Sequence, residues 1–582
     1  MCGIAGIISK RKELKNTEQL LSKFRKILKH RGPNEEGQWI EDWLGCTHVR
    51  LSIVDIAKGQ QPMFESENKK IGIVYNGEIY NYKELKHELL QKGYSFKTDC
   101  DTEVIIKAYE AWGVDSFNKL NGMFAYCLWD YKTNITYLVR DYIGMKPLYI
   151  YEDDEILAFS SEIKALTTLP NVNLDIDPLG VQDYLMFRYT HAPHTIFKKI
   201  YRLEAGTYIQ FKKMKATKFR YWDIVYNPSL TKINIERIKE EILDTLNKIV
   251  KSQLMGEVPI GVLLSGGIDS SIIAYLIHKN NANLTTFNIG YPEANEFEYS
   301  REIANKFGLK HIELTTTIDD LISDIDKIIC FLDEPIADPA CFPLYRLCEE
   351  LKRHVTVVLS GEGGDELFAG YPQYVSTLNS NINCLESFNV FMKQSYYYLN
   401  YSNFMRNHNK LANVFRHKKY FDENCLLNGM LCYDLKTWVP EDLMMKADKI
   451  MMAHSLEGRF PFLDKRIIEL VHKIPPEYKL NSDGITKWIL KQTFSPYLPK
   501  RIINRPKMGF TVPVELLLEK LKTKIIYLSS NIKNTPLNEI LNTTSVENII
   551  NEYYTYKKHP AMQIWTVFIL LYWFDQIYKE RL

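Results

Sequence analysis

The sequence lacks an excess of either charge. Its 73 lysine and arginine residues nearly balance 71 aspartate and glutamate residues, which leaves a formal net charge of +2 over 582 residues. Proteins that bind nucleic acid or an anionic membrane surface by general electrostatic attraction carry a strong basic excess. We therefore expect small-molecule partners, with no nucleic acid and no membrane among them. The sequence leaves a homodimer open.

Paired cysteines and long hydrophobic runs are also absent. The ten cysteines form no CxxC pair and have no metal-ligand spacing, which indicates a reducing compartment. No apolar stretch follows the N-terminus as in a secretory signal. The hydrophobic run at 567–574 is far shorter than the roughly 20 residues of a membrane span. We expect a cytoplasmic protein in which this run forms a buried helix.

A chain of 582 residues is too long for one hydrophobic core, so two or three domains are expected. Residues 1 to about 200 alternate short apolar stretches with turn signals, such as 71–75 followed by Asn76-Gly77. Long helices are suggested there only at 81–92 and 102–112. This pattern predicts an α+β domain of strands with helices packed on sheets.

The pattern changes after residue 235, where apolar strands alternate with helices. The predicted elements are a long amphipathic helix at 235–253, strands at 258–264, 284–290 and 355–359, and a helix at 296–307. Buried apolar strands of this kind are typical of a doubly wound parallel α/β sheet. From about 375 onward the segments suggest helices that cover the sheet.

Cys2 is the most informative single residue, because a small second residue favours removal of the initiator methionine. Cys2 would then carry a nucleophilic thiol beside its own α-amino group, whose pKa of about 7.7 to 8.0 suits a base. Three polar groups could serve it: Arg50 as a fork for a carboxylate, Asn76-Gly77-Glu78 as oxyanion donors with an acid, and Asp101 as a partner for an ammonium. Each alone is more often structural, and a frayed terminus is the alternative for Cys2.

Two glycine-rich loops follow predicted strands in the second half. The loop 265–271, with the sequence SGGIDSS, precedes a helix and predicts a phosphate-binding turn that differs from the motif GxxxxGK[ST]. The loop 360–371 places three carboxylates among glycines at the carboxyl end of a strand, where nucleotides and magnesium bind in such sheets. A capped helix start and a solvated acidic turn are the structural alternatives.

Together these motifs resemble the glutamine-hydrolysing asparagine synthetases over essentially the whole chain. The first half is similar to the family's class II glutamine amidotransferase domain through MCGIAG at 1–6, HRGPN at 30–34, RLSIVD at 50–55, YNGEIYN at 75–81, DTE at 101–103, LNGMFA at 120–125, RDYIGMKPLY at 140–149 and SSEIKAL at 160–166. The second half is similar to its ATP pyrophosphatase domain through VLLSGGIDSS at 262–271, DEPIADPA at 333–340, LSGEGGDELFAGY at 359–371, LEGRFPFLD at 456–464, TKWILK at 486–491 and RPKMGF at 505–510.

The resemblance implies an α+β fold of the N-terminal nucleophile type, a sandwich of antiparallel sheets between helices, over residues 1–205. It implies an α/β doubly wound parallel-sheet domain with a helical C-terminal cover over residues 235–582. The first would be the glutaminase domain and the second the synthetase domain.

In the glutaminase domain, the resemblance implies that Cys2 attacks the carboxamide of glutamine while Asn76 and the Gly77 amide stabilise the oxyanion. Arg50 would hold the glutamine α-carboxylate, and Glu78 and Asp101 would hold its α-ammonium and neighbouring atoms. The same resemblance adds four glutamine-binding residues, Leu51, Ser52, Ile53 and Val54.

In the synthetase domain, the resemblance implies an ATP and Mg²⁺ site. The implied ATP-binding residues are Leu264, Ser265, Gly266, Gly267, Asp269, Ser270, Ile289, Ser360 and Gly361. Asp269 and Asp365 would coordinate magnesium, Glu362 would be the catalytic acid or base, and Lys487 would neutralise phosphate. The site would adenylate the aspartate side chain and release pyrophosphate, and ammonia from the first domain would arrive through an internal tunnel.

The sequence departs from the family pattern at five positions. Asn34 replaces the usual aspartate of HRGPD, Gly364 a frequent serine and Ala369 a glycine, and Gly458 and Phe460 stand where β-branched residues are usual. None of these removes a named catalytic group. They leave open an alternative acceptor for the same mechanism, such as a carboxylate on a surface-sugar or cell-wall precursor.

Overall fold

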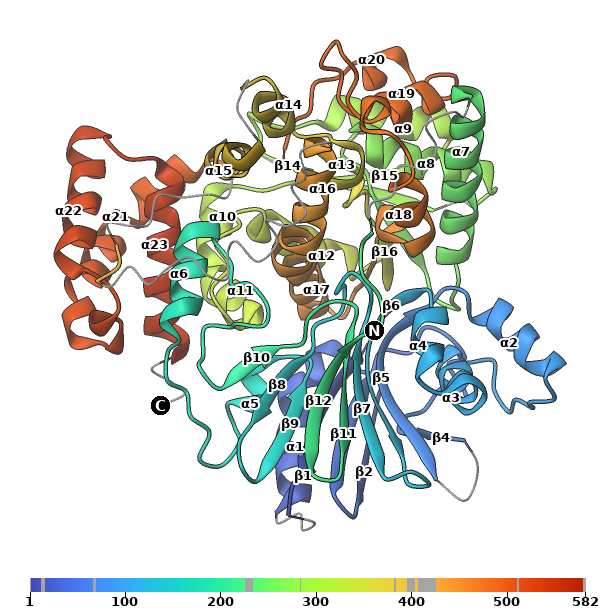
Figure 1. Ribbon diagram of the computed structural model, residues 1–582. Helices are drawn as coiled ribbons and strands as arrows, with labels where there is room; N and C mark the ends of the chain where they lie inside the picture. Colours follow the sequence, from blue (N-terminus) through green and yellow to red (C-terminus); the bar gives the residue numbers. More distant parts are fainter. Residues whose placement is uncertain are drawn as a thin grey trace.

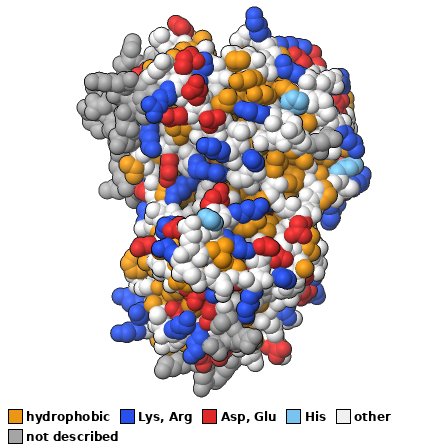
Figure 2. Space-filling view, turned by 90° about the vertical axis from the view of Figure 1, so that its right-hand side faces the viewer, with side chains coloured by type: hydrophobic (Ala, Val, Ile, Leu, Met, Phe, Trp, Pro, Cys, Tyr) orange, Lys and Arg blue, Asp and Glu red, His pale blue; other side chains and the backbone are white. Residues whose placement is uncertain are grey.

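The computed structural model describes residues 2–11, 16–65, 70–225, 234–282, 284–380, 384–394, 404–406, 425–509 and 512–578. Met1 and Phe510, the end residues of two sequence motifs, lie outside this part of the chain. Figure 1 shows a strand-rich half formed by the N-terminal residues below a helix-rich half. On the face drawn in Figure 2, positive and negative side chains are intermixed, in keeping with the near-zero net charge.

Within the described residues, the N-terminal half contains two six-stranded antiparallel sheets. The first has the order β10-β8-β9-β1-β3-β2 and the second the order β12-β11-β7-β6-β5-β4. The strands of the first are β1 Cys2–Ser9, β2 Glu35–Glu41, β3 Leu44–Arg50, β8 Tyr149–Glu152, β9 Ile156–Ser160 and β10 Ile200–Arg202. Those of the second are β4 Met63–Phe64, β5 Ile71–Ile79, β6 Gly122–Asp130, β7 Ile135–Arg140, β11 Thr207–Lys212 and β12 Lys215–Arg220.

The two sheets pack face to face between helices. Ile4, Val74 and Leu138 belong to the buried cluster between the sheets. The covering helices are α1 Thr17–Leu28 on the first sheet and α2 Tyr82–Gln91 and α3 Asp101–Trp112 on the second, with short helices α4 Ser116–Lys119 and α5 Ile163–Leu166. This architecture confirms the expected sandwich and the two expected helices. Helix α1 was not anticipated.

One expectation from turn chemistry is wrong. Asn76-Gly77 does not end a strand, because both residues lie inside β5 and pair with Ala125 and Phe124 of β6. A Cβ on Gly77 would lie 2.1 Å from the carbonyl oxygen of Met123. The glycine therefore permits close strand pairing, and the β-ladder overrides the local preference for a turn.

The C-terminal half is built on a parallel sheet with the order β15-β14-β13-β16-β17. Its strands are β13 Ile260–Leu263, β14 Thr285–Gly290, β15 Lys310–Thr315, β16 Val357–Leu359 and β17 Glu457–Arg459. The strand order reverses between β13 and β16, and ligands bind at such switch points in doubly wound sheets. Helices α7 Ile235–Gln253 and α9 Phe297–Phe307 match the expected ranges.

Strand β17 corrects the expectation that the C-terminal region is purely helical. It has three residues and pairs with β16, which lies about a hundred residues earlier in the chain, so no local pattern marks it. The helices around the sheet are α8 Ile268–Lys279, α10 Ile318–Ser323, α11 Ile325–Leu332, α12 Cys341–Leu351, α13 Gly364–Phe368, α14 Pro372–Leu378, α15 Cys384–Gln394, α16 Leu426–Lys436, α17 Met444–Ala453, α18 Lys465–Val471, α19 Trp488–Phe494, α20 Lys500–Ile503, α21 Val514–Ser530, α22 Thr543–Tyr556 and α23 Ala561–Trp573.

The apolar C-terminal run is a buried helix, as expected. Every residue of α23 from Gln563 to Trp573 is buried. Among the described residues, no helix combines the length and the hydropathy required to cross a membrane.

The two halves share a large buried contact. Helix α6, Pro178–Phe187, belongs to the first half in sequence but lies beside α23 (Figure 1), where the Tyr184 hydroxyl donates a 2.7 Å hydrogen bond to the carbonyl of Thr566. Arg202 at the end of β10 pairs with Glu334 and Glu441 of the second half, and all three side chains are buried. The halves therefore form one packed body in which a site on each can be related to the other.

Candidate active sites

Cys2 begins β1, and its position is fixed by two neighbouring strands. It pairs with Arg50 of β3, and its backbone nitrogen donates a 2.9 Å hydrogen bond to Oδ1 of Asn76 on β5. The residue is buried, and this burial raises the pKa of its thiol above the ordinary value. The thiol therefore requires a nearby base or a bound substrate to reach its nucleophilic form.

Asn76 places an unused hydrogen-bond donor beside Cys2. Its side chain is completely buried, and while Oδ1 accepts the bond from Cys2, Nδ2 has no hydrogen-bond partner among the described residues. A buried donor without a partner is costly, so such a group usually meets a ligand. Nδ2 is thus available to a negative oxygen that develops next to the thiol.

Arg50 is held by the loop that follows it. Its Nη1 donates to Glu35 Oε2 at 2.8 Å, and the two terminal nitrogens together donate to the carbonyl oxygens of Val54, Asp55 and Ile56 at 2.9 to 3.1 Å. Gly59 closes this loop, and a Cβ there would lie 2.1 Å from Nη2 of Arg50. The guanidinium is therefore fixed in place with its charge only partly compensated by one half-buried glutamate.

Two carboxylates lie at the opposite end. Glu78 Oε2 is buried without a hydrogen-bond partner among the described residues, and burial, together with Glu457 and Asp101, raises its pKa well above the usual value. Asp101 accepts hydrogen bonds from the Tyr75 hydroxyl and the Ile79 amide, both at 2.9 Å, and burial raises its pKa too. In the described part of the chain no lysine or arginine pairs with either acid. A ligand ammonium would supply the missing cation.

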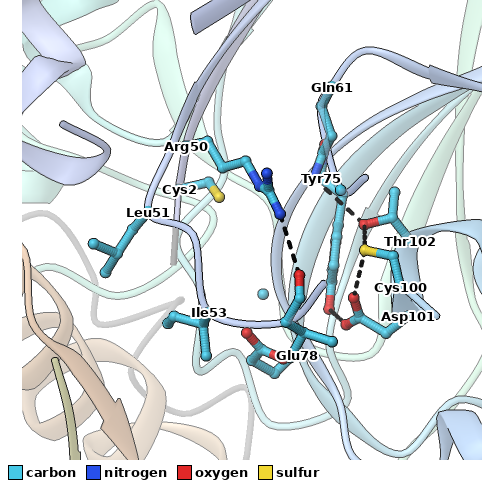
Figure 3. Close-up of a pocket in the computed structure, with 13 residues that line it drawn as sticks. Cys2, Arg50, Leu51, Ile53, Gln61, Tyr75, Glu78, Cys100, Asp101 and Thr102 are labelled. Carbon is cyan, nitrogen blue, oxygen red and sulfur yellow. Dashed lines mark hydrogen bonds between the residues drawn. The ribbon is translucent and has the colours of Figure 1, made fainter. Parts of the chain in front are cut away.

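A pocket joins these groups. Figure 3 shows Cys2 and Arg50 on one side and Tyr75 and Asp101 on the other, with Glu78 below them in the view. The lining residues are Cys2, Arg50, Leu51, Ile53, Val54, Gly59, Gln61, Tyr75, Gly77, Glu78, Cys100, Asp101 and Thr102. A cationic fork, a thiol and an acidic end match an amino acid with a reactive side chain.

The cavity brings together most of the residues expected from the sequence. Ser52 and Asn76 are not part of its lining: the Ser52 amide donates to Oδ1 of Asn34 at 3.0 Å, and Asn76 acts through its contact with Cys2. Asn34 thus provides the acceptor that an aspartate would provide at this departure from the family pattern. Thr102, which follows Asp101 in the DTE motif, also lines the pocket. The sequence missed Gly59, Gln61, Tyr75 and Cys100, of which only Tyr75 had a signal, since it shares a strand face with Gly77.

The first glycine-rich loop lies between β13 and α8 at the switch point of the parallel sheet. Ser265 Oγ accepts a 3.3 Å hydrogen bond from the Gly267 amide and lies 3.2 Å from Ser270 Oγ, which donates to the Gly267 carbonyl. Gly266 has φ of +72°, and a Cβ there would lie 2.5 Å from Cβ of Tyr299. This tight turn directs hydroxyls and the start of α8 toward one point, as an anion site requires.

The second loop follows β16, and its Asp365 is linked to Asp269 of the first loop by Lys487, which pairs with both. Lys487 Nζ lies 2.5 Å from Asp269 Oδ2 and 2.6 Å from Asp365 Oδ1, and Lys507 Nζ lies 2.6 Å from Asp365 Oδ2. Although burial raises it, Lys487 and Lys507 hold the pKa of Asp365 at about 2. Lys507 lies in the RPKMGF motif, but its position in the site was not anticipated.

The donor set around Asp269 fits a magnesium ion. Asp269 Oδ1 is buried and accepts no hydrogen bond in the described residues, and a Cβ on Gly364 would lie 2.5 Å from that atom. Gly364, at a position where serine is frequent in the family, thus leaves Oδ1 of Asp269 uncovered. Among the described residues no cluster of three or more acidic, histidine or cysteine side chains could hold a metal. Magnesium bound by one or two carboxylates takes its other ligands from phosphate and water.

The remaining expected residues lie around the same point. Ser360 follows β16 and its amide donates to the Arg459 carbonyl at 2.9 Å, while Gly361 lies against Asp269 and Ser270 closely enough that its Cβ would be 3.0 Å from both. Glu362 is half-buried, its Oε2 has no hydrogen-bond partner among the described residues, and burial raises its pKa. Leu264 and Ile289 are buried at the ends of β13 and β14.

One buried arginine connects the thiol site to the C-terminal half. Arg31 donates through Nε to the Cys2 carbonyl at 3.1 Å, through Nη1 to Glu162 at 2.9 Å and through Nη2 to Asp448 of α17 at 2.8 Å. Lys146 also pairs with Asp448, at 3.3 Å. The backbone of the nucleophile is therefore held by the same guanidinium that binds a helix of the other half.

Two family models match the chain, one described as asparagine synthase over residues 241–575 and one as glutamine amidotransferase domain over residues 1–222. Asparagine synthetase [glutamine-hydrolyzing] 1 of Bacillus subtilis is 31% identical over 100% of this chain and 98% of its own length. A putative asparagine synthetase [glutamine-hydrolyzing] of Mycobacterium bovis is 30% identical over 94% of this chain and 92% of its own. Asparagine synthetase B [glutamine-hydrolyzing] of Escherichia coli is 28% identical over 88% of this chain and 82% of its own.

Proposed function

Because the chain belongs to the asparagine synthase family, a family of ATP-dependent, glutamine-hydrolysing ligases, we propose that it is a glutamine-dependent asparagine synthetase. Glutamine would be hydrolysed in a domain of residues 1–205. The side-chain carboxylate of aspartate would be activated with ATP in a domain of residues 235–582, and the ammonia released by the first would form the amide at the second.

In the glutaminase step, the Cys2 sulfur attacks the carboxamide carbon of glutamine. With the initiator methionine removed, the α-amino group of Cys2 takes the thiol proton and passes it to the departing ammonia. Asn76 Nδ2 and the Gly77 amide stabilise the oxyanion of the tetrahedral intermediate. Collapse of this intermediate leaves a glutamyl thioester, which water hydrolyses to glutamate and free Cys2.

In the synthetase step, an oxygen of the acceptor carboxylate attacks the α-phosphorus of ATP. The bond to the β-phosphate oxygen breaks, and pyrophosphate leaves into the loop 265–270 beside Lys487. Magnesium held by Asp269 and Asp365 would neutralise phosphate charge when bound. Ammonia then attacks the acyl carbon, AMP leaves, and Glu362, whose raised pKa suits proton transfer, takes the excess proton from nitrogen.

One observation carries the proposal. The Cys2 cavity has a fixed arginine at one end and two buried acids without a cation at the other, with an unpartnered amide donor next to the thiol. This arrangement supports a zwitterionic amino acid whose side chain reaches the thiol. The five departures from the family pattern do not weaken it. At Gly458, for example, a Cβ would lie 2.5 Å from Met451 Sδ, so this glycine accommodates a larger neighbour and opens no space.

The direct test combines purified protein with glutamine, aspartate and magnesium-ATP. We expect asparagine, glutamate, AMP and pyrophosphate in equal amounts. Formation of ADP would contradict the proposed adenylation. If aspartate gave no stimulation of pyrophosphate release but a sugar or peptide carboxylate did, the same mechanism would serve the alternative acceptor.

A further inference from the structure

A second group of charged side chains lies next to Glu362, outside the residues considered so far. It consists of Arg188, Asp338, Asp442 and Lys446, which we name the charged recess. Asp442 and Lys446 are buried, and Arg188 and Asp338 are half-buried. Three separate stretches of the chain supply these residues, so the recess exists only in the folded protein.

The recess has defined geometry. Lys446 Nζ pairs with Asp338 Oδ2 at 2.8 Å, and Asp442 lies one helical turn before Lys446, where the π-helical turn Val439–Leu443 runs into α17. The Ala337 amide donates to the Arg188 carbonyl at 2.9 Å, which brings Arg188 next to Asp338. Despite burial, Lys446 and Arg188 hold the pKa of Asp338 below its usual value, so this carboxyl is ionised.

Two polar atoms of the recess have no hydrogen-bond partner among the described residues. They are Oδ1 of Asp442, whose Oδ2 accepts a 2.8 Å hydrogen bond from the indole of Trp438, and Nε of Arg188. Asp442 is only 2% exposed. A buried acceptor without a donor costs about 1 to 3 kcal/mol, more for a charged group, so these atoms are poised for a ligand.

A chain of ring and charge contacts connects the recess to the nucleotide site. The Trp438 ring lies 5.1 Å from the Tyr371 ring, Lys507 Nζ lies 5.4 Å from that same ring, and Lys507 pairs with Asp365. Glu362 lies close enough to Lys446 and Asp338 that each affects its pKa. A ligand in the recess would therefore have one end beside Glu362 and Lys507.

We propose that the charged recess recognises the α-amino-acid head group of the acceptor. Lys446 and Arg188 receive the α-carboxylate, and Asp442 and Asp338 receive the α-ammonium. The side-chain carboxylate is left facing Glu362 and Lys507. This inference rests on the proposed function, and it adds residues that the sequence motifs did not assign.

Charge matching separates amino acids from other acceptors. A zwitterionic head group brings both an anion and a cation, and so satisfies the cations and the acids of the recess together. A sugar carboxylate brings one anion and neutral hydroxyls, which would leave Oδ1 of Asp442 without a cation. A site with buried groups built for a partner rejects an analogue that lacks it, by more than about 100-fold.

The test uses ammonia in place of glutamine and measures pyrophosphate release, so that the thiol site is not involved. The variants are Asp442→Asn, which keeps an acceptor for Trp438 but removes the charge, and Lys446→Met. Exposed residues of the same half give the matched controls, Asp483→Asn and Lys473→Met. Each protein is assayed with aspartate, with succinate, which lacks the ammonium, and with 3-aminopropanoate, which lacks the α-carboxylate.

We expect the KM for aspartate to rise about 10- to 100-fold in both variants, because loss of one hydrogen bond to a charged group weakens binding by about this factor. The KM for ATP and the glutaminase rate should stay within two-fold of those of the controls. Asp442→Asn should reduce the preference for aspartate over succinate, and Lys446→Met the preference for aspartate over 3-aminopropanoate. An unchanged KM for aspartate, or equal loss with all three acceptors, would overturn the inference. If the unmodified enzyme ignored aspartate, the proposed function itself would fail, and the two failures are thus distinct.

Discussion

The two sites treat their buried acids in opposite ways. In the Cys2 cavity, Glu78 and Asp101 have no cationic partner among the described residues, and burial raises the pKa of both. In the nucleotide site, Asp269 and Asp365 are bridged by Lys487, and Lys507 adds a second cation to Asp365. The first site is arranged for a ligand that brings its own positive charge. The second places two lysines beside its acids, which suits an anionic ligand such as ATP.

Because the two sites are built differently, we predict that a substitution in one site leaves the reaction at the other site unchanged. The largest effect should follow Cys2→Ala, which removes the nucleophile. Glutamine-dependent synthesis should fall by more than about 1,000-fold, the scale seen when a covalent nucleophile is lost. Ammonia-dependent synthesis should stay within two-fold, because the nucleotide site is unchanged. Product formation from each nitrogen source measures both rates, and equal loss of the two would refute the separation of the sites.

The reciprocal change is Lys487→Met, which leaves Asp269 and Asp365 facing each other without their bridge. Synthesis from glutamine and from ammonia should both fall by about 100- to 1,000-fold. Loss of one fixed group that stabilises negative charge in the transition state has an effect of this size. Glutamine hydrolysis should be retained. Lys491→Met, one turn further along α19, is the matched control. A similar loss in that control would show that the helix, and not the bridge, is required.

A smaller effect is expected from Glu78→Gln in a Cys2→Ala background, where glutamine binds without reaction. Since burial beside Glu457 and Asp101 raises the pKa of Glu78, the free carboxyl is protonated below that pKa. The glutamine ammonium favours its ionised form, so the affinity for glutamine should increase as the pH rises toward this pKa. Glu78→Gln should weaken binding by about 10-fold and flatten this pH dependence. Calorimetric titration across pH measures both, and an unchanged slope would show that Glu78 does not bind the ammonium.

Much of this comparison could be predicted from the sequence. Cys2, Arg50, Asn76, Asp269 and Asp365 each lie in a motif, and the predicted order of strand, glycine turn and helix is present in the structure as β13, the loop 264–267 and α8. What the sequence could not provide is the pairing between distant segments. The Asn76-Gly77 pair looked like a turn because its β6 partner is some fifty residues away, and β17 went unnoticed because its three residues pair with β16.

The missed site residues have the same cause. Asp338 lies in the DEPIADPA motif but was given no role from it, and Arg188 and Asp442 lie in none of the motifs. Each of the three is separated from the next by more than a hundred positions. Such residues are far more often surface groups, and no local pattern distinguishes these from them. Only tertiary packing places them together beside Glu362, where the loss of solvent strengthens the interactions that we propose for an acceptor head group.

The smallest effect should fall on the connection between the sites. Asp448 forms ion pairs with Lys146 and with Arg31, and Arg31 also donates a hydrogen bond to the Cys2 carbonyl. Asp448→Asn removes the charge and loosens the hold on the nucleophile without touching either substrate. We expect glutamine hydrolysis to become less dependent on synthesis. The ratio of glutamate to asparagine produced should rise by about five-fold, because the weakest energetic couplings between two sites in a protein are of this size.

Glu441→Gln is the matched control for Asp448→Asn, since Glu441 forms a separate buried ion pair across the halves, with Arg202. If both variants raised the ratio equally, general loosening of the interface would explain the result. If only Asp448→Asn raised it, the coupling would depend on the Arg31 guanidinium, which contacts both Cys2 and Asp448.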